Sequence, residues 1–359
     1  MAPTRVLVVD DSAVARRLVC DALATEPSIA VAGTASNGRL ALAKLPQLNP
    51  DVVTLDVEMP EMDGLATLVE LRKSYPHLPV IMFSAVTERG ASATLDAIAR
   101  GANDYVTKPV GAGGIEGARR HIAVELVPRI KAFSRRVHGP ASEQGAPVAP
   151  LRRPSPLLNA AVEVLCIGVS TGGPNALAEL IPALPAGLPV PVLVVQHMPP
   201  VFTRLLADRL DGCSALEVRE CHGDEVLRPG FVYIARGDHH MRVHGSRAEV
   251  RLKLDQGPAE NSCRPAVDVL FRSAAELFGG GVLAAVLTGM GQDGLRGCEL
   301  VRERGGRVLA QDQATSVVWG MPGAVARAGL AERVVPLGAM ASELMNCVNS
   351  KRATWWRKP

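Results

Sequence analysis

Cys166-Ile167-Gly168-Val169-Ser170-Thr171-Gly172-Gly173-Pro174 lies between an apolar run and a segment with helical spacing. Residues 162–167 predict a buried strand and residues 175–181 predict the start of a helix, so Ser170 stands at a strand-to-helix turn. Small flanking residues allow a sharp turn that projects the serine hydroxyl from the end of the sheet. Backbone N–H groups at such a turn could instead bind phosphate. The motif alone leaves both interpretations open.

Alternating strand and helix patterns extend from this turn through residues 161–349. Apolar runs that predict strands lie at 162–168, 191–196, 231–234, 282–287, 307–310 and 333–335. Helical spacing lies between them, at 202–210, 267–278, 294–303 and 324–328. Alternation between Met241 and Leu254, with a turn at Gly245-Ser246, predicts a β-hairpin. We therefore expect an α/β domain with a mostly parallel, Rossmann-like sheet and an added hairpin.

Three polar residues follow strands of this predicted sheet: Ser170, His197 and Asp293. Serine, histidine and aspartate supply the nucleophile, base and orienting acid of a hydrolytic triad. Each has an ordinary alternative, because His197 could be a loop histidine and Asp293 could cap the helix that follows it. The glycine-rich run 289–294 could be a tight loop or could bring N–H groups to an oxyanion. The chain order Ser, His, Asp differs from that of α/β-hydrolases and argues against that fold.

The N-terminal part repeats a strand–helix pattern five times. Strand runs lie at 6–9, 29–33, 52–55, 80–83 and 104–106, and helical segments at 14–24, 38–45, 64–73 and 89–100. Strands that are apolar throughout predict a five-stranded parallel sheet with helices on both faces. Both domains are thus expected to be doubly wound, with ligand sites at the carboxyl ends of their strands.

Five polar residues stand at those strand ends: Asp10, Asp11, Asp56, Ser84 and Lys108. Three converging carboxylates repel one another and require a cation, and oxygen ligands suit Mg²⁺. A lysine and a hydroxyl opposite them could hold a small tetraoxyanion, as a site that phosphorylates a carboxylate requires. The alternative is a set of solvated loop carboxylates.

Composition and linker patterns complete the domain plan. From about residue 137 to 160, Pro, Gly, Ser and Ala dominate, which is typical of a linker. The segment 115–136 could be a last helix that runs toward it, with Pro128 as a kink or a helix start. We assign residues 1–125 and 161–349 to the two domains, 126–160 to the linker, and 350–359, with Trp355 and Trp356, to a tail of unknown role.

The charge and hydropathy of the chain exclude several classes of protein. A net charge of +3 without a basic stripe argues against nucleic-acid binding. The chain starts without a signal peptide, and no apolar run is long enough to span a bilayer, so we expect a cytoplasmic protein that is not membrane-embedded. Seven cysteines without a C-x-x-C pair predict reduced thiols.

The N-terminal motifs are Asp-Asp-Ser at 10–12, Asp-x-x-Met-Pro-x-Met-Asp-Gly at 56–64, Ser-Ala at 84–85 and Lys-Pro at 108–109. With these motifs, residues 5 to about 120 resemble the receiver domain of two-component response regulators. The resemblance implies that a histidine kinase phosphorylates Asp56, that Asp10, Asp11 and Asp56 bind Mg²⁺, and that Ser84, Tyr105 and Lys108 are the switch residues. Tyr105 could equally be an ordinary strand aromatic.

The second domain carries motifs at 168–174, 196–199, 264–271, 287–294, 310–312 and 319–322, among them Gly-Val-Ser-Thr-Gly-Gly-Pro and Leu-Thr-Gly-Met-Gly-Gln-Asp-Gly. It resembles the catalytic domain of chemotaxis protein-glutamate methylesterases of the CheB type. The resemblance implies Ser170 as nucleophile, His197 as base, Asp293 as orienting acid, and Thr171 and Met290 as oxyanion contributors. Two residues depart from the pattern: Cys263 stands where the family often has histidine, and Ala266 where it often has serine.

The two resemblances together imply a phosphorylation-activated hydrolase in chemotaxis adaptation. It would remove methyl groups from glutamate γ-methyl esters on methyl-accepting chemoreceptors and deamidate receptor glutamines, with no cofactor for the esterase reaction. The unphosphorylated receiver would cover the edge that carries Ser170. The rival interpretation is a response regulator whose second domain only binds a ligand at the 168–173 turn, which leaves His197 and Asp293 without a role.

Overall fold

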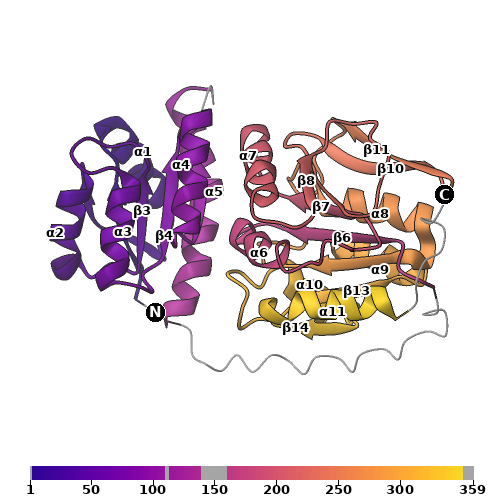
Figure 1. Cartoon of the computed structure of the whole chain (residues 1–359). Helices are drawn as coiled ribbons and strands as arrows, with labels where there is room; N and C mark the ends of the chain where they lie inside the picture. The colour runs from indigo at the N-terminus through magenta and orange to yellow at the C-terminus, as the bar shows by residue number, and fades with distance from the viewer. Residues whose placement is uncertain (1, 110–112, 139–159, 351–359) are drawn as a thin grey trace. The chain divides into compact units, whose positions relative to one another are not determined.

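The computed structural model describes residues 2–109, 113–138 and 160–350 (Figure 1). The chain forms two compact units, residues 1–143 and 144–359. Most of the expected linker, residues 139–159, and all but the first residue of the expected tail lie outside the described residues. Among the described residues, none of the helices has the length and apolar character needed to cross a bilayer.

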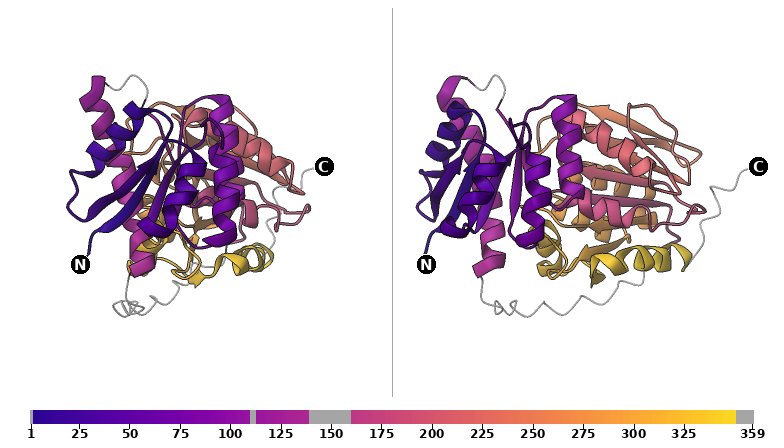
Figure 2. Two further views of the ribbon diagram at one scale, coloured as in Figure 1. Left: turned by 90° about the vertical axis from the view of Figure 1, so that its left-hand side faces the viewer. Right: turned by 60° about the vertical axis from the view of Figure 1, so that its left-hand side comes forward.

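A five-stranded parallel sheet with the order β2-β1-β3-β4-β5 forms the centre of the N-terminal unit. Its strands are β1 (Thr4–Val9), β2 (Ile29–Ala35), β3 (Val52–Asp56), β4 (Val80–Ser84) and β5 (Asp104–Thr107). Its helices are α1 (Ala13–Leu23), α2 (Gly38–Leu48), α3 (Gly64–Ser74), α4 (Glu88–Ala99) and α5 (Gly114–His138). Helices cover both faces of this sheet (Figure 2), so β3 and β4 are buried along their whole length.

Four of these helices begin at a polar N-cap residue. The side chains of Ser12, Asn37, Asp63 and Thr87 each accept a hydrogen bond from the backbone N–H three residues later. Such bonds satisfy N–H groups that the helix leaves unpaired, and they fix where the helix starts. The loops between strand ends and helices, which carry the polar residues, are therefore short and well defined.

Helix α5 confirms the alternative that residues 115–136 form a last helix. Residues 126–138 of the range that we assigned to the linker are thus helical, with Pro128 inside the helix. Proline removes one helical hydrogen bond and clashes with the preceding turn. Here Leu126, Ile130 and Phe133 form a buried stripe at helical spacing, and this burial outweighs the cost of the proline.

The C-terminal unit has a seven-stranded sheet with the order β14-β13-β12-β6-β7-β9-β8, in which every pairing is parallel. Its strands are β6 (Val164–Val169), β7 (Val192–Gln196), β8 (Glu217–Glu220), β9 (Phe231–Ile234), β12 (Val282–Val286), β13 (Arg307–Gln311) and β14 (Arg333–Val335). The hairpin of β10 (His240–Ser246) and β11 (Glu249–Asp255) is a separate two-stranded sheet. The predicted class, two doubly wound α/β domains, is confirmed.

The helices of this unit are α6 (Gly173–Leu180), α7 (Pro200–Asp211), α8 (Val267–Phe278), α9 (Leu295–Glu303), α10 (Met321–Arg327) and α11 (Leu337–Asn349), with a 3₁₀ turn η1 (Gly279–Gly281). Helices α6, α7 and α11 are neighbours, as are α8, α9 and α10, so two groups cover the sheet. Strand order reverses at β6, whose neighbours are β7 and β12. Such a switch point is where ligands bind in open α/β sheets.

Besides helix α11, which has no counterpart among the predicted helices, two details differ from the predictions. Strand β8 was missed, because Glu-Val-Arg-Glu is a short edge strand that buries only alternate residues. The hairpin turns at residues 247–248, since Ser246 still pairs with Glu249, and not at Gly245-Ser246.

Candidate functional sites

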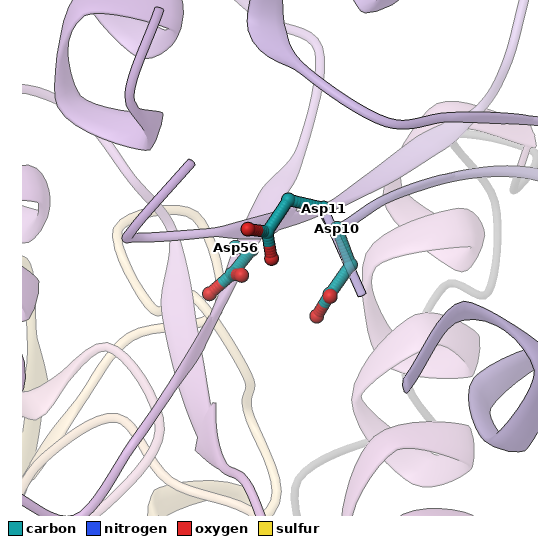
Figure 3. A group of neighbouring side chains, drawn as sticks. All are labelled: Asp10, Asp11 and Asp56. Carbon is teal, nitrogen blue, oxygen red and sulfur yellow. The ribbon is translucent and has the colours of Figure 1, made fainter. Parts of the chain in front are cut away.

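Three carboxylates meet at the carboxyl ends of β1 and β3. One carboxylate oxygen from each of Asp10, Asp11 and Asp56 lies within 4.8 Å of the others (Figure 3). Asp10 and Asp56 are buried, whereas Asp11 is exposed. Lys108, which follows β5, places its Nζ 2.9 Å from Asp10 Oδ2 and 2.7 Å from Asp56 Oδ2.

The charges at this site do not balance, because one ammonium group faces three carboxylates. Burial raises the pKa of Asp56; the hydrogen bond from Lys108 opposes this and the charge of Asp10 adds to it, so that the pKa is about 6. A pKa above the ordinary range means that the site disfavours the full negative charge. An all-oxygen donor set with excess negative charge fits Mg²⁺.

Ser84 and Tyr105 lie on the neighbouring strands β4 and β5. Ser84 is fully buried, and its Oγ donates to the carbonyl oxygens of Gly90 (3.1 Å) and Ala85 (3.3 Å). Its hydroxyl is therefore bound to the loop and first turn of α4. Tyr105 is buried, and burial raises its pKa well above the usual range, so the phenol stays neutral.

In the second unit, Ser170 and His197 stand side by side at the switch point. Ser170 directly follows β6 and His197 directly follows β7, and the preceding residues, Val169 and Gln196, are paired in register. The buried Gln196 donates its Nε2–H to the carbonyl oxygens of Ser170 (3.0 Å) and His197 (3.3 Å). A Cβ on Gly173 would lie 1.9 Å from Gln196 Oε1, so this clamp requires glycine there.

Asp293, in the loop after β12, is hydrogen-bonded to His197. Asp293 Oδ2 lies 2.8 Å from His197 Nε2. The same carboxylate accepts hydrogen bonds from four further donors: the backbone N–H groups of Val267 (2.6 Å), Asp268 (3.1 Å) and Gly294 (2.9 Å), and Asn261 Nδ2 (3.0 Å). A buried carboxylate with this many donors remains ionised. Its bond to Nε2 leaves Nδ1 of the neutral imidazole free to accept a proton.

The pKa shifts follow from these contacts. Burial by itself lowers the pKa of His197, but the hydrogen bond that its Nε2–H donates to Asp293 and the contact with Cys263 outweigh it and raise the pKa to about 9. Burial raises the pKa of Asp293, whereas His197 and the backbone N–H donors lower it, and the net pKa is below the ordinary value. The pair therefore favours an imidazolium beside a carboxylate.

The two residues expected to stabilise an oxyanion lie on either side of Ser170. Thr171 is buried in the turn after it. A Cβ on Gly289 would lie 2.9 Å from the Cβ of Ser170, so the loop that carries Met290 packs against the serine. Within residues 160–350, the N–H groups of Thr171 and Met290 donate to no backbone carbonyl oxygen. Both N–H groups are thus available to a ligand near Ser170.

Gln196 and Asn261 were not identified as site residues from the sequence. Gln196 carries a weak signal, a polar residue at the end of a buried strand. Asn261 lies in an irregular loop with a positive φ of 52°, and its position beside Asp293 depends on contacts between distant parts of the chain.

Comparisons with known proteins match both units. The CheB methylesterase family model matches residues 165–344, and the response regulator receiver domain model matches residues 6–118. A protein-glutamate methylesterase/protein-glutamine glutaminase of Trichodesmium erythraeum is 51% identical over 344 residues, which cover 95% of this chain and 98% of that protein. A protein of the same name from a Nocardioides species is 53% identical and covers 97% of this chain and 96% of its own length. The crystal structure of the Thermotoga maritima CheB methylesterase catalytic domain matches with a TM-score of 0.51 and 44% identity over 52% of this chain and 99% of that chain.

Proposed function

This chain belongs to the CheB methylesterase family and carries a receiver domain, and from this premise we propose that it is a cytoplasmic hydrolase of glutamate γ-methyl esters on chemoreceptors. It also deamidates receptor glutamines, as the double name of its relatives suggests. The observation that carries the proposal is the meeting of Ser170, His197 and the buried Asp293 at one sheet edge.

In the proposed reaction, Ser170 Oγ attacks the ester carbonyl while Nδ1 of His197 takes its proton. Nδ1 is the accepting atom because Nε2 is bonded to Asp293, which stabilises the imidazolium that forms. The N–H groups of Thr171 and Met290 stabilise the oxyanion. The imidazolium then returns the proton to the leaving methoxide, methanol departs, and water hydrolyses the acyl-enzyme by the same route in reverse.

Deamidation uses the same residues with a poorer leaving group. The amide nitrogen must be protonated before it leaves as ammonia, so this reaction depends more strongly on the imidazolium than ester cleavage does. We therefore expect the esterase to be the faster of the two activities.

The receiver site regulates this reaction. A histidine kinase phosphorylates Asp56, and Mg²⁺ held by Asp10, Asp11 and Asp56 would offset the charge of the carboxylates and the phosphoryl group. Lys108 contacts the phosphoryl oxygens, and Ser84 leaves its carbonyl partners on α4 to do the same. Tyr105 responds on the adjacent strand. The result is a shift in population toward a conformation with an accessible Ser170.

Methanol release from methylated chemoreceptor membranes tests the proposal. Wild type and Ser170→Ala are compared, each with and without acetyl phosphate and Mg²⁺. We expect release by wild type that increases with the phosphodonor, and none by Ser170→Ala. If the two proteins released methanol equally, Ser170 would not be the nucleophile, and the rival interpretation of a binding domain would gain support. A small activated ester assayed in parallel separates an inactive enzyme from an unsuitable receptor.

A further inference from the structure

The thiol of Cys263 lies next to Nδ1 of His197, the nitrogen that acts as the base. Cys263 Sγ lies 3.5 Å from His197 Nδ1, and Nδ1 is the atom that accepts a proton because Nε2 is bonded to Asp293. Cys263, His197 and Asp293 therefore form a second chain of thiol, imidazole and carboxylate beside the one that starts at Ser170. The imidazole is only 12% exposed and Cys263 is partly exposed, so the thiol forms part of the accessible side of the site.

The loop that carries Cys263 is anchored on both sides of the cysteine. Before it, Asn261 and Ser262 have positive φ angles of 52° and 63°, and Cys263 exchanges two backbone hydrogen bonds with Glu260 (2.8 and 3.1 Å). After it, Arg264 forms an ion pair with Asp238. Positive φ angles are unusual for residues other than glycine, and two in succession persist only where the surrounding contacts hold the backbone. The thiol is thus fixed beside the imidazole.

The other six cysteines differ from Cys263 in their surroundings. Burial raises the pKa of Cys20, Cys166, Cys221, Cys298 and Cys347, which makes these thiols poor nucleophiles. Cys213 is exposed, and its sulfur contacts the carbonyl oxygen of Leu210. It has access to solvent, and its sulfur contacts a carbonyl oxygen where that of Cys263 contacts an imidazole, so it is a matched internal control.

We propose that His197 activates the thiol of Cys263, and that Cys263 and Ser170 contact the imidazole in turn. A covalent group on the sulfur of Cys263 then inhibits ester hydrolysis. This inference rests on the proposed function for its second half only. In the resting enzyme the thiol contacts Nδ1, and Ser170 replaces it at the imidazole when substrate binds. In ester hydrolysis Cys263 is a positioning residue, because it acts through His197.

The expected reaction with an alkylating agent can be written in full. In the molecules whose imidazole is neutral, the proton of Cys263 moves to Nδ1, and the thiolate attacks the methylene carbon of iodoacetamide. A carbon–sulfur bond forms, the carbon–iodine bond breaks, and iodide leaves with the electron pair. The imidazolium, stabilised by Asp293, later loses the proton to water. The carboxamidomethyl group on the sulfur then disrupts the contact between Cys263 and the imidazole and obstructs Nδ1.

Competitive labelling of the full-length protein with limiting iodoacetamide at pH 7, read by peptide mass spectrometry, tests the thiol. In wild type we expect Cys263 to react at least about tenfold faster than Cys213, because a neighbouring imidazole promotes thiolate formation. This advantage should be lost in His197→Gln and kept in Ser170→Ala, which retains the base. Equal rates for Cys263 and Cys213, or a Cys263 rate that is independent of His197, would contradict the proposal.

Two activity measurements test the link to the esterase. Hydrolysis of a small activated ester should fall in proportion to Cys263 labelling. Full labelling without loss of hydrolysis would show that modification of Cys263 does not inhibit the esterase.

In Cys263→Ala, the acid limb of the kcat/KM profile should move to lower pH, because one of the groups that raise the pKa of His197 is gone. The charged groups that remain near the imidazole are Asp293 and, beyond it, Asp268 and Arg272. Cys263→Ser, which keeps a hydrogen-bond donor but cannot form a thiolate, should shift the limb in the same direction. An unmoved limb in both variants would contradict a role through His197. If wild type hydrolysed no ester at all, the proposed function would fail while the labelling experiment still decided the reactivity of the thiol.

Discussion

The two sites of this protein occupy equivalent places in two parallel sheets, yet their charges are arranged in opposite ways. At the receiver site, three carboxylates face one lysine, and the pKa of Asp56 is raised to about 6. At the second site, the carboxylate beside the histidine, Asp293, has five hydrogen-bond partners and a lowered pKa. The first site has more negative than positive charge, whereas the negative charge of Asp293 at the second site is already stabilised by its hydrogen-bond partners.

This difference explains how the two sites can serve different purposes. A site that needs a cation and a phosphoryl group changes state when these arrive or leave, and it can therefore act as a switch. A site whose histidine and carboxylate are already hydrogen-bonded, with N–H groups left for an oxyanion, is organised for reaction before substrate binds. Such a site cannot regulate itself through its own charges, which is why we assign control of Ser170 to the receiver.

The largest expected effect comes from removing the negative charge of Asp293 at the second site. Asp293→Asn should reduce kcat for ester hydrolysis on the order of 10³- to 10⁴-fold, because the amide can hold the imidazole in the wrong tautomer. Asp268→Asn is the matched control, since Asp268 is the neighbouring buried carboxylate and accepts its hydrogen bonds from Asn261 and the backbone N–H of Gly297. Circular dichroism would show that both variants fold. Equal losses in the two variants would mean that Asp293 acts only as a structural residue.

Much of this contrast was predictable from the sequence. The residues of the receiver site are all near strand ends, so local patterns placed Asp10, Asp56 and Lys108 correctly at one edge. The residues of the second site were also found at strand ends. What could not be predicted was the support around Asp293, because Asn261 and the N–H groups of α8 reach it through long-range packing. The last helix was predicted over residues 115–136, but whether Pro128 kinks it or starts a second helix was left open, because the burial that carries one helix through Pro128 depends on packing.

The pH dependence of hydrolysis should reflect the electrostatics of the second site. The base acts in its neutral form, and the pKa of His197 is raised to about 9. Between pH 7 and 8, kcat/KM for a small ester should therefore rise about tenfold, and it should level off above the pKa. Ser170→Ala, measured at each pH, corrects for hydrolysis by hydroxide. A profile that is flat above pH 7 would show that the imidazole is already neutral there.

A smaller effect is expected when the switch itself is disabled. Asp56→Asn should hydrolyse the ester without phosphodonor and should lose the entire increase that acetyl phosphate and Mg²⁺ produce in wild type. The reason is that an amide cannot accept a phosphoryl group. The parallel variant Asp11→Asn keeps the phosphate acceptor and removes only an exposed carboxylate from the cation site, so it should weaken the response to Mg²⁺ without abolishing it. If acetyl phosphate and Mg²⁺ increased hydrolysis by Asp56→Asn as much as by wild type, acetyl phosphate would act at a residue other than Asp56.

The smallest expected effect is on stability, and it depends on the charge imbalance at the receiver site. The pKa of Asp56 is raised from 3.8 to about 6, so its contribution to stability is fully present below the lower value and is lost as pH rises through the higher one. The loss is at most about 3 kcal/mol on the scale of 1.36 kcal/mol per pKa unit. At pH 7.5, Asp56→Asn should therefore increase the free energy of unfolding of the receiver by about 1–2 kcal/mol, while Mg²⁺ should stabilise wild type more than the variant. Scanning calorimetry with and without Mg²⁺ measures both changes, and the transition of the second unit serves as the internal control. If the variant were less stable than wild type at pH 7.5, the bond between Asp56 and Lys108 would outweigh the cost of burying the charge, and the receiver site would be complete in the same sense as the second.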